Sequence, residues 1–184
     1  MNLSEKQLTS KPVFNGKILT VRLDTALLPN GNTAEREIVE HPGGVGVIPI
    51  TENGEVLLVE QFRYSYGANV LEIPAGKRSV GEDPLFCGQR ELKEETGASA
   101  KHFTYLGEVY PTPGYSTEII HLYAATGLSF SEATPDEDEF LNLVKMPLSE
   151  LVDKTVSGEI KDAKTQIAAL KATRLIENGK ITLK

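Results

Sequence analysis

The chain has 184 residues, which is enough for one ordinary domain with its own hydrophobic core, or for one domain with a small appendage. Its hydrophobic share of 40% is typical of a soluble globular protein, and no apolar run approaches the ~20 residues that cross a membrane. A net charge of −7 argues against broad nucleic-acid binding, and the N-terminus lacks the apolar core of a signal peptide. We therefore expect a cytoplasmic protein with no nucleic-acid or membrane partner.

The first half of the chain predicts antiparallel strands. Residues 14–41 resemble a small meander, with the turn signal Pro29-Asn30-Gly31 at its middle, and residues 51–55 form a second turn. Strands are predicted over 18–23, 36–40, 45–50, 56–61 and 71–76. The last of these strands ends abruptly at a proline and a glycine.

A helix is predicted next, with a marked start and end. Asp83 offers a side-chain acceptor at the N-cap, and Pro84 follows it with a fixed φ and no amide hydrogen to satisfy. Gly97 stands where a helix ends in a left-handed turn. Packing against the domain is expected from the residues of one face, Leu85, Leu92 and Thr96.

Three carboxylates occupy another face of this helix. Glu91, Glu94 and Glu95 stand at i, i+3 and i+4, so like charges are crowded together at a cost in stability. A positive group among them would remove this cost, and three hard oxygen ligands favour Mg²⁺ or Mn²⁺. The alternative is an ordinary solvated acidic face, which the loop and strand that precede the helix argue against.

The rest of the chain adds strands and two helices. Strands are predicted over 103–110, 118–124 and 140–146, and helices over 148–157 and 162–177. Strands placed around one early helix and two late helices make the fold class α+β.

The segment from Gly76 to Ala98 resembles the Nudix box without a gap; it reads GKRSVGEDPLFCGQRELKEETGA. Nudix proteins hydrolyse a nucleoside diphosphate linked to another moiety, using Mg²⁺ or Mn²⁺ held by the box helix. The chain also resembles the ADP-ribose pyrophosphatase branch, in which a proline stands sixteen positions after the last box glycine, as Pro113 follows Gly97. The other segments that carry this resemblance are 36–43, 60–63, 71–76, 110–114 and 136–140.

The resemblance implies a fold and an assembly. We expect the α/β/α sandwich of the Nudix fold over residues 43–184, preceded by a small N-terminal β region over 1–42. In relatives that region exchanges between subunits and helps to build the active site, so the resemblance implies a homodimer.

The resemblance also implies the metal site. Glu91 and Glu95 are expected as ligands together with the backbone carbonyl of Ala75, and Glu94 as a catalytic member of the same cluster. Arg90 is expected to hold neighbouring carboxylates in place. Glu82 is expected to orient the loop and the helix, with direct metal binding as the alternative.

An acidic loop beyond the box supplies the base that activates water in this branch. Residues 136–139 stand in the place of that loop. We predict Glu137 as the base and Glu139 as a further metal ligand. The two roles could be exchanged, because the sequence does not fix the register of a loop.

Substrate contacts are expected at strand ends. Arg36 and Arg63 could each pair with phosphates or ribose hydroxyls through two parallel hydrogen bonds. Glu37 and Glu118 could hold ribose hydroxyls. Phe14 could stack on adenine, and a place in the core is its alternative.

These assignments predict the Mg²⁺-dependent hydrolysis of ADP-ribose to AMP and ribose 5-phosphate. One alternative is hydrolysis of another nucleoside diphosphate sugar such as GDP-mannose. The other is a Nudix-like binding module without activity, but such modules usually lose a box glutamate and this chain has all four.

Overall fold

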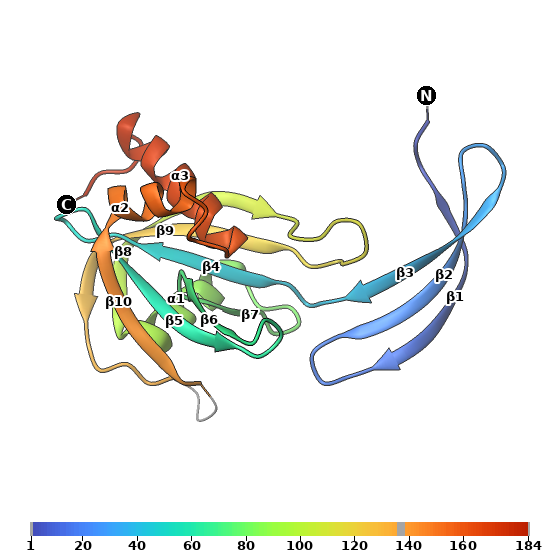
Figure 1. Ribbon diagram of the computed structural model, residues 1–184, viewed down its shortest axis with the longest axis horizontal. Helices are drawn as coiled ribbons and strands as arrows, with labels where there is room; N and C mark the ends of the chain where they lie inside the picture. Colours follow the sequence, from blue (N-terminus) through green and yellow to red (C-terminus); the bar gives the residue numbers. More distant parts are fainter. Residues whose placement is uncertain (1, 136–138, 184) are drawn as a thin grey trace. The chain divides into compact units, whose positions relative to one another are not determined.

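The computed structural model describes residues 2–135 and 139–183, and the described chain forms two compact units. One unit comprises Met1–Gly43 and Tyr110–Ile119, and the other comprises Gly44–Val109 and Ile120–Lys184 (Figure 1). The strands are β1 (Lys6–Asn15), β2 (Thr20–Leu27), β3 (Thr33–Glu40), β4 (Gly44–Pro49), β5 (Glu55–Arg63), β6 (Ala68–Glu72), β7 (Ala75–Lys77), β8 (Ala98–Val109), β9 (Ile120–Phe130) and β10 (Leu141–Pro147). The helices are α1 (Pro84–Thr96), α2 (Leu148–Val156) and α3 (Ala163–Glu177).

The first unit is built on an antiparallel sheet in the order β1-β2-β3. The predicted turn joins β2 to β3, and Gly31 takes there the positive φ of 87° that a glycine tolerates. Strand β1 was not predicted. It contains Pro12 and two register shifts, lies at the sheet edge, and exposes every one of its residues, so it has no alternation of apolar and polar side chains to reveal it.

The second unit contains two sheets. One is mixed, in the order β7-β4-β9-β8 with β4 parallel to β9, and the other is antiparallel in the order β10-β5-β6. The strand predicted over 71–76 is split in two, because Pro74 lies between the end of β6 and the start of β7. Its carbonyl still accepts a hydrogen bond from Val47 N at 2.9 Å, which holds the connection against β4.

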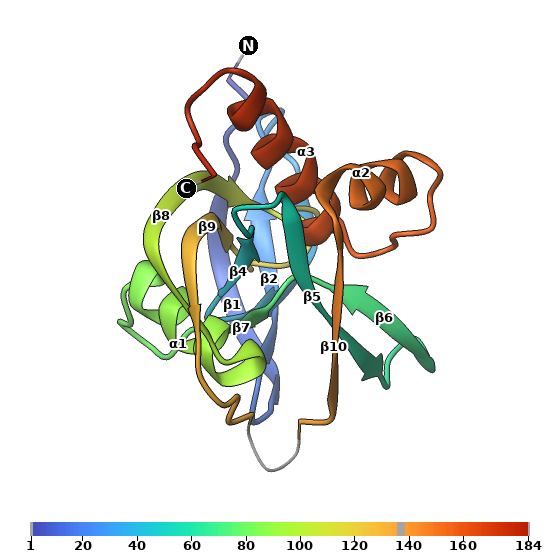
Figure 2. The ribbon, with the colours of Figure 1, turned by 90° about the vertical axis from the view of Figure 1, so that its left-hand side faces the viewer.

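Helices cover both faces of the mixed sheet (Figure 2). On one face, Val47 of β4 packs in a cluster with Cys87 and Leu92 of α1. On the other face, Ile48 packs in a second cluster with Ala168 and neighbouring residues of α2 and α3. Neighbouring residues of a strand point to opposite faces, so this alternation produces three layers. The predicted α+β class is confirmed.

The termini of α1 lie where they were predicted. Asp83 Oδ1 accepts hydrogen bonds from Leu85 N at 2.8 Å and Phe86 N at 3.3 Å, as an N-cap does. Gly97 closes the helix in the left-handed conformation with φ 70°, and its N–H donates to Lys93 O. None of the three helices in the described ranges is both long enough and apolar enough to cross a membrane.

Candidate active site

The start of β7 lies directly against two carboxyl groups of α1. Ala75 N–H donates a hydrogen bond to Glu95 Oε2 at 3.0 Å. A Cβ atom built on Gly76 would overlap the carboxyl group of Glu91, so that carboxyl group fills the space which a side chain would need. The glycine of the box is therefore required by contact, because it lets the backbone of residues 75 and 76 approach both glutamates.

Both of these carboxyl groups are buried, and each glutamate is only 7% exposed. Burial raises the pKa of Glu95 to about 8, against the opposing effect of the Ala75 hydrogen bond and with added repulsion from Glu91 and Glu139. Burial also raises the pKa of Glu91, and the nearby charge of Arg90 only partly offsets it. A divalent cation would relieve the cost of keeping these two groups ionised, so the residues present suit such an ion.

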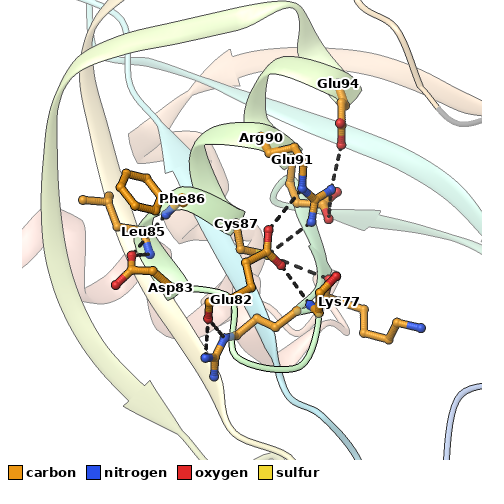
Figure 3. Close-up of polar contacts among 11 residues, drawn as sticks. Lys77, Glu82, Asp83, Leu85, Phe86, Cys87, Arg90, Glu91 and Glu94 are labelled. Atoms are coloured by element: carbon orange, nitrogen blue, oxygen red, sulfur yellow. Dashed lines mark hydrogen bonds and ion pairs between the residues drawn. The ribbon is translucent and has the colours of Figure 1, made fainter.

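Arg90 joins the acidic side chains of the box (Figure 3). Its Nη1 lies 2.8 Å from Glu91 Oε1 and 2.9 Å from Glu94 Oε2, and its Nε lies 3.3 Å from Glu82 Oε1. Glu82 Oε2 in turn accepts from Ser79 N at 2.8 Å, which ties the loop before α1 to the helix. The predicted pairing of Arg90 with its carboxylate neighbours is confirmed.

This pairing includes the third predicted member of the cluster. Glu94 Oε2 lies against Arg90 Nη1, as Glu91 Oε1 does, and its catalytic role stays a prediction. Within the ranges that the structure describes, no group of three or more His, Cys, Asp or Glu side chains is arranged to hold a metal ion. Among the predicted ligands, the structure brings the carboxyl groups of Glu91 and Glu95 against the backbone of residues 75 and 76.

The acidic loop can be followed only in part. Glu137, the predicted base, lies outside the described residues. Glu139 is described, and its negative charge contributes to the raised pKa of both Glu91 and Glu95. Glu139 therefore lies near the same two carboxyl groups, and the roles of Glu137 and Glu139 stay predictions.

Arg63 lies at the end of β5 and has a partner that the sequence did not reveal. Its Nε and Nη2 donate to Glu72 Oε1 at 2.6 Å and Glu72 Oε2 at 2.8 Å, a bidentate pair. Lys164 at the start of α3 bonds to the same carboxylate from 92 positions away in the sequence. In the sequence, Asp162 marks the start of a helix. No pattern in the sequence indicates that this end of the helix lies against Glu72.

The other predicted substrate residues belong to the unit formed by Met1–Gly43 and Tyr110–Ile119. Arg36 makes a bidentate pair with Glu5, at 2.7 and 3.0 Å. Glu37 is exposed on β3, and Glu118 Oε1 lies 3.4 Å from His41 Nδ1. Phe14 is 56% exposed, which argues against its alternative placement in the core of the chain. Their substrate roles stay predictions.

Comparisons with known proteins define the class. Residues 40–167 match the NUDIX domain model, and residues 5–39 match the nucleoside diphosphate sugar hydrolase N-terminal domain. The first match covers more than half of the chain, so the chain belongs to the Nudix family and is a Nudix hydrolase, as predicted. Enzymes of this family generally use divalent metal ions.

Several curated relatives cover most of the chain. It is 43% identical over 166 residues to a methanol dehydrogenase activator of Bacillus methanolicus, covering 89% of this chain and 90% of that one. It is 40% identical over 169 residues to an ADP-ribose pyrophosphatase of Bacillus subtilis (strain 168), covering 91% of each. A GDP-mannose pyrophosphatase of Yersinia enterocolitica is 35% identical over 148 residues, covering 74% of this chain and 77% of that one.

One solved structure has the same fold over nearly its full length. It is described as the crystal structure of an ADP compounds hydrolase, with a TM-score of 0.85 and 23% identity, covering 98% of this chain and 100% of that one. At this identity the likeness concerns the fold, and it confirms the predicted Nudix fold.

Proposed function

We propose that the protein hydrolyses the pyrophosphate of ADP-ribose to AMP and ribose 5-phosphate, with Mg²⁺ or Mn²⁺ as its cofactor. The observation that carries the proposal is the burial of Glu91 and Glu95 against the backbone of Ala75 and Gly76. The choice of substrate is supported by the relatives named ADP-ribose pyrophosphatase, one of 40% identity from Bacillus subtilis and one of 33% from Mycobacterium tuberculosis.

The residues have separate tasks in this proposal. Glu91, Glu95 and the carbonyl of Ala75 hold the ion, which when bound neutralises diphosphate charge and lowers the pKa of a bound water. Arg90 keeps the neighbouring carboxylates in place, and Glu94 is a catalytic member of the same cluster. Glu137 takes the proton of the attacking water and Glu139 adds a ligand, or the two exchange these roles. The substrate is bound by Arg36, Arg63, Glu37, Glu118 and Phe14.

The assembly and domain division belong to the same proposal. Residues 43–184 form the hydrolase domain, and residues 1–42 form a region through which two chains make a homodimer. Support comes from the separate match of residues 5–39 to a nucleoside diphosphate sugar hydrolase N-terminal domain.

A second candidate substrate is GDP-mannose. It is favoured by the relatives named GDP-mannose pyrophosphatase, at 35% identity in Yersinia enterocolitica and 33% in Cronobacter sakazakii. The same metal-binding carboxylates would serve either substrate, so only the recognition of the nucleotide and the sugar differs.

The test is turnover on a panel of ADP-ribose, ADP-glucose, GDP-mannose, NADH and diadenosine polyphosphates, with Mg²⁺ or with EDTA. We expect metal-dependent preference for ADP-ribose, and a kcat at least ~10²-fold lower in Glu95→Gln, because that variant loses a carboxylate ligand. Glu52→Gln is the control, since it neutralises an exposed carboxylate in the turn between β4 and β5.

Three results would contradict parts of the proposal. Unchanged turnover in Glu95→Gln would refute its assignment to the metal. Preference for GDP-mannose would overturn the substrate. A folded protein that is silent on the whole panel would favour a binding module without activity.

A further inference from the structure

The first turn of α3 docks onto the end of β6. Thr165 Oγ1 accepts a hydrogen bond from Ile73 N at 2.8 Å, and Thr165 is fully buried. Asp162 Oδ2 caps the helix by accepting from Thr165 N at 2.9 Å and from Thr165 Oγ1 at 2.6 Å. These bonds fix where the side chain of Lys164, which belongs to the same turn, can reach.

Two cations share one buried carboxylate at this point. Glu72 is 3% exposed and accepts from both Arg63 and Lys164, while Lys164 Nζ also lies 3.0 Å from Asp162 Oδ1. Burial opposes ionisation of Glu72, but the hydrogen bond from Arg63 and the charge of Lys164 lower its pKa. The four side chains are thus two cations and two anions, and their formal charges cancel.

We infer that Lys164 is a positioning residue that acts through Glu72 on the substrate-binding guanidinium of Arg63. Its side chain is 11% exposed and is engaged with two carboxylates, so it acts on substrate through its neighbours. This inference rests on the proposed function, in which Arg63 binds the anionic substrate.

Two consequences follow from the charge of Lys164. Without Lys164, the remaining group consists of Arg63, Glu72 and Asp162. Its formal net charge is one negative charge. The same guanidinium would then present a weaker positive field to an anionic diphosphate. Binding of substrate should therefore weaken, although Arg63 itself is unchanged.

The effect on cation binding has the opposite sign. Lys164 holds its positive charge between Glu72 and Asp162, and Glu72 ends β6 just before the β7 residue Ala75 of the candidate metal site. Removal of this positive charge makes that region more negative, which favours a divalent cation. A general disturbance of packing would weaken substrate binding and cation binding together.

The experiment compares full-length Lys164→Met, Lys164→Gln and Lys164→Arg with wild type. In Lys164→Met and Lys164→Gln, KM for ADP-ribose should rise ~5- to 20-fold while kcat changes less than ~3-fold, since uniform substrate binding is lost. Lys164→Arg, which keeps the charge, should return KM to within ~3-fold of wild type. Mn²⁺ titrated alone and followed by electron paramagnetic resonance should bind each variant at least as tightly as wild type.

The matched control is Lys171→Met, two helical turns further along α3. Lys171 Nζ donates to Leu106 O at 2.7 Å, so this variant also removes one charge and one hydrogen bond from the helix. It should leave KM unchanged. If it raises KM as much as Lys164→Met does, the effect is one of net charge and the inference is wrong.

The remaining outcomes separate the inference from the proposed function. An unchanged KM in Lys164→Met, or Mn²⁺ binding that weakens with it, would overturn the positioning role. If wild type prefers another nucleotide sugar, the proposed substrate fails while the same KM comparison on that sugar still decides the role of Lys164.

Discussion

The Glu95 side chain combines deep burial with a hydrogen bond from the Ala75 amide. Its pKa of about 8 in the folded, metal-free protein lies far above the ordinary value of 4.5. Between these two values the folded state keeps a proton that the unfolded state has released. The contribution of this group to the free energy of unfolding should therefore be fully present below about pH 4.5. It should be lost as the pH rises through about 8.

The substitution Glu95→Gln should remove this pH-dependent loss of the free energy of unfolding. In EDTA the variant should exceed wild type in the free energy of unfolding by roughly 1–3 kcal/mol at pH 8, and the difference should vanish near pH 4.5. Urea denaturation at the two pH values measures it. Adding Mg²⁺ at pH 8 should stabilise wild type more than the variant. A difference that does not change with pH would contradict the burial argument.

Contacts between residues close in sequence could be predicted from the sequence, whereas contacts between residues distant in sequence could not. The spacing of Glu91 and Glu95 places both on one face of α1, so the sequence sufficed to pair them. Glu72 and Lys164 meet across 92 positions, and their contact depends on how α3 docks. The pair of Arg90 with Glu94 is again local, four positions apart on α1, and it formed as predicted.

At the scale of elements, two glycines let α1 approach the mixed sheet closely. A Cβ on Gly88 would come within 3.0 Å of side-chain atoms of Val45 and Val47 on β4. A Cβ on Gly76 of β7 would instead overlap the Glu91 carboxyl group. The first glycine therefore sets the packing distance, and the second keeps room for a carboxylate of the candidate metal site.

Gly76→Ala should therefore damage the site more than the fold. The added methyl group must displace Glu91, so we expect kcat to fall at least ~10²-fold and Mn²⁺ binding to weaken, as when a metal ligand is misplaced. Steady-state turnover and Mn²⁺ titration measure the two effects. Gly114→Ala, where nothing lies within 4 Å of the added atom, is the control. Wild-type activity in Gly76→Ala would show that Glu91 is free to move without loss.

Elements were predictable where local chemistry marked them. Asp83 and Gly97 mark both ends of α1, and both caps formed as predicted. The split between β6 and β7 follows from Pro74, which interrupts the single strand predicted over 71–76. Strand β1 carried no such mark, because an edge strand with two register shifts needs neither alternation nor a turn signal of its own.

At the scale of the whole molecule, the net charge of −7 must be reconciled with an anionic substrate. Several described carboxylates at or beside the candidate metal site are paired with specific cations. Arg90 forms ion pairs with Glu82, Glu91 and Glu94. Arg63 and Lys164 form ion pairs with Glu72. Local pairing with cations, together with a divalent ion, allows a diphosphate to approach a protein whose overall charge repels it.

The proposed homodimer makes a prediction about β1. An edge strand with every residue exposed, among them Leu8 and Val13, offers unpaired backbone groups and apolar side chains to a second chain. Light scattering should give wild type twice the 20.1 kDa mass of one chain. The double variant Leu8→Glu with Val13→Glu should lower this mass toward that of one chain, because buried charges on both sides of the contact would repel. Val156→Glu, an exposed position on α2, should leave the mass unchanged. A wild-type mass of 20.1 kDa would refute the dimer, and a dimeric double variant would place its contact elsewhere.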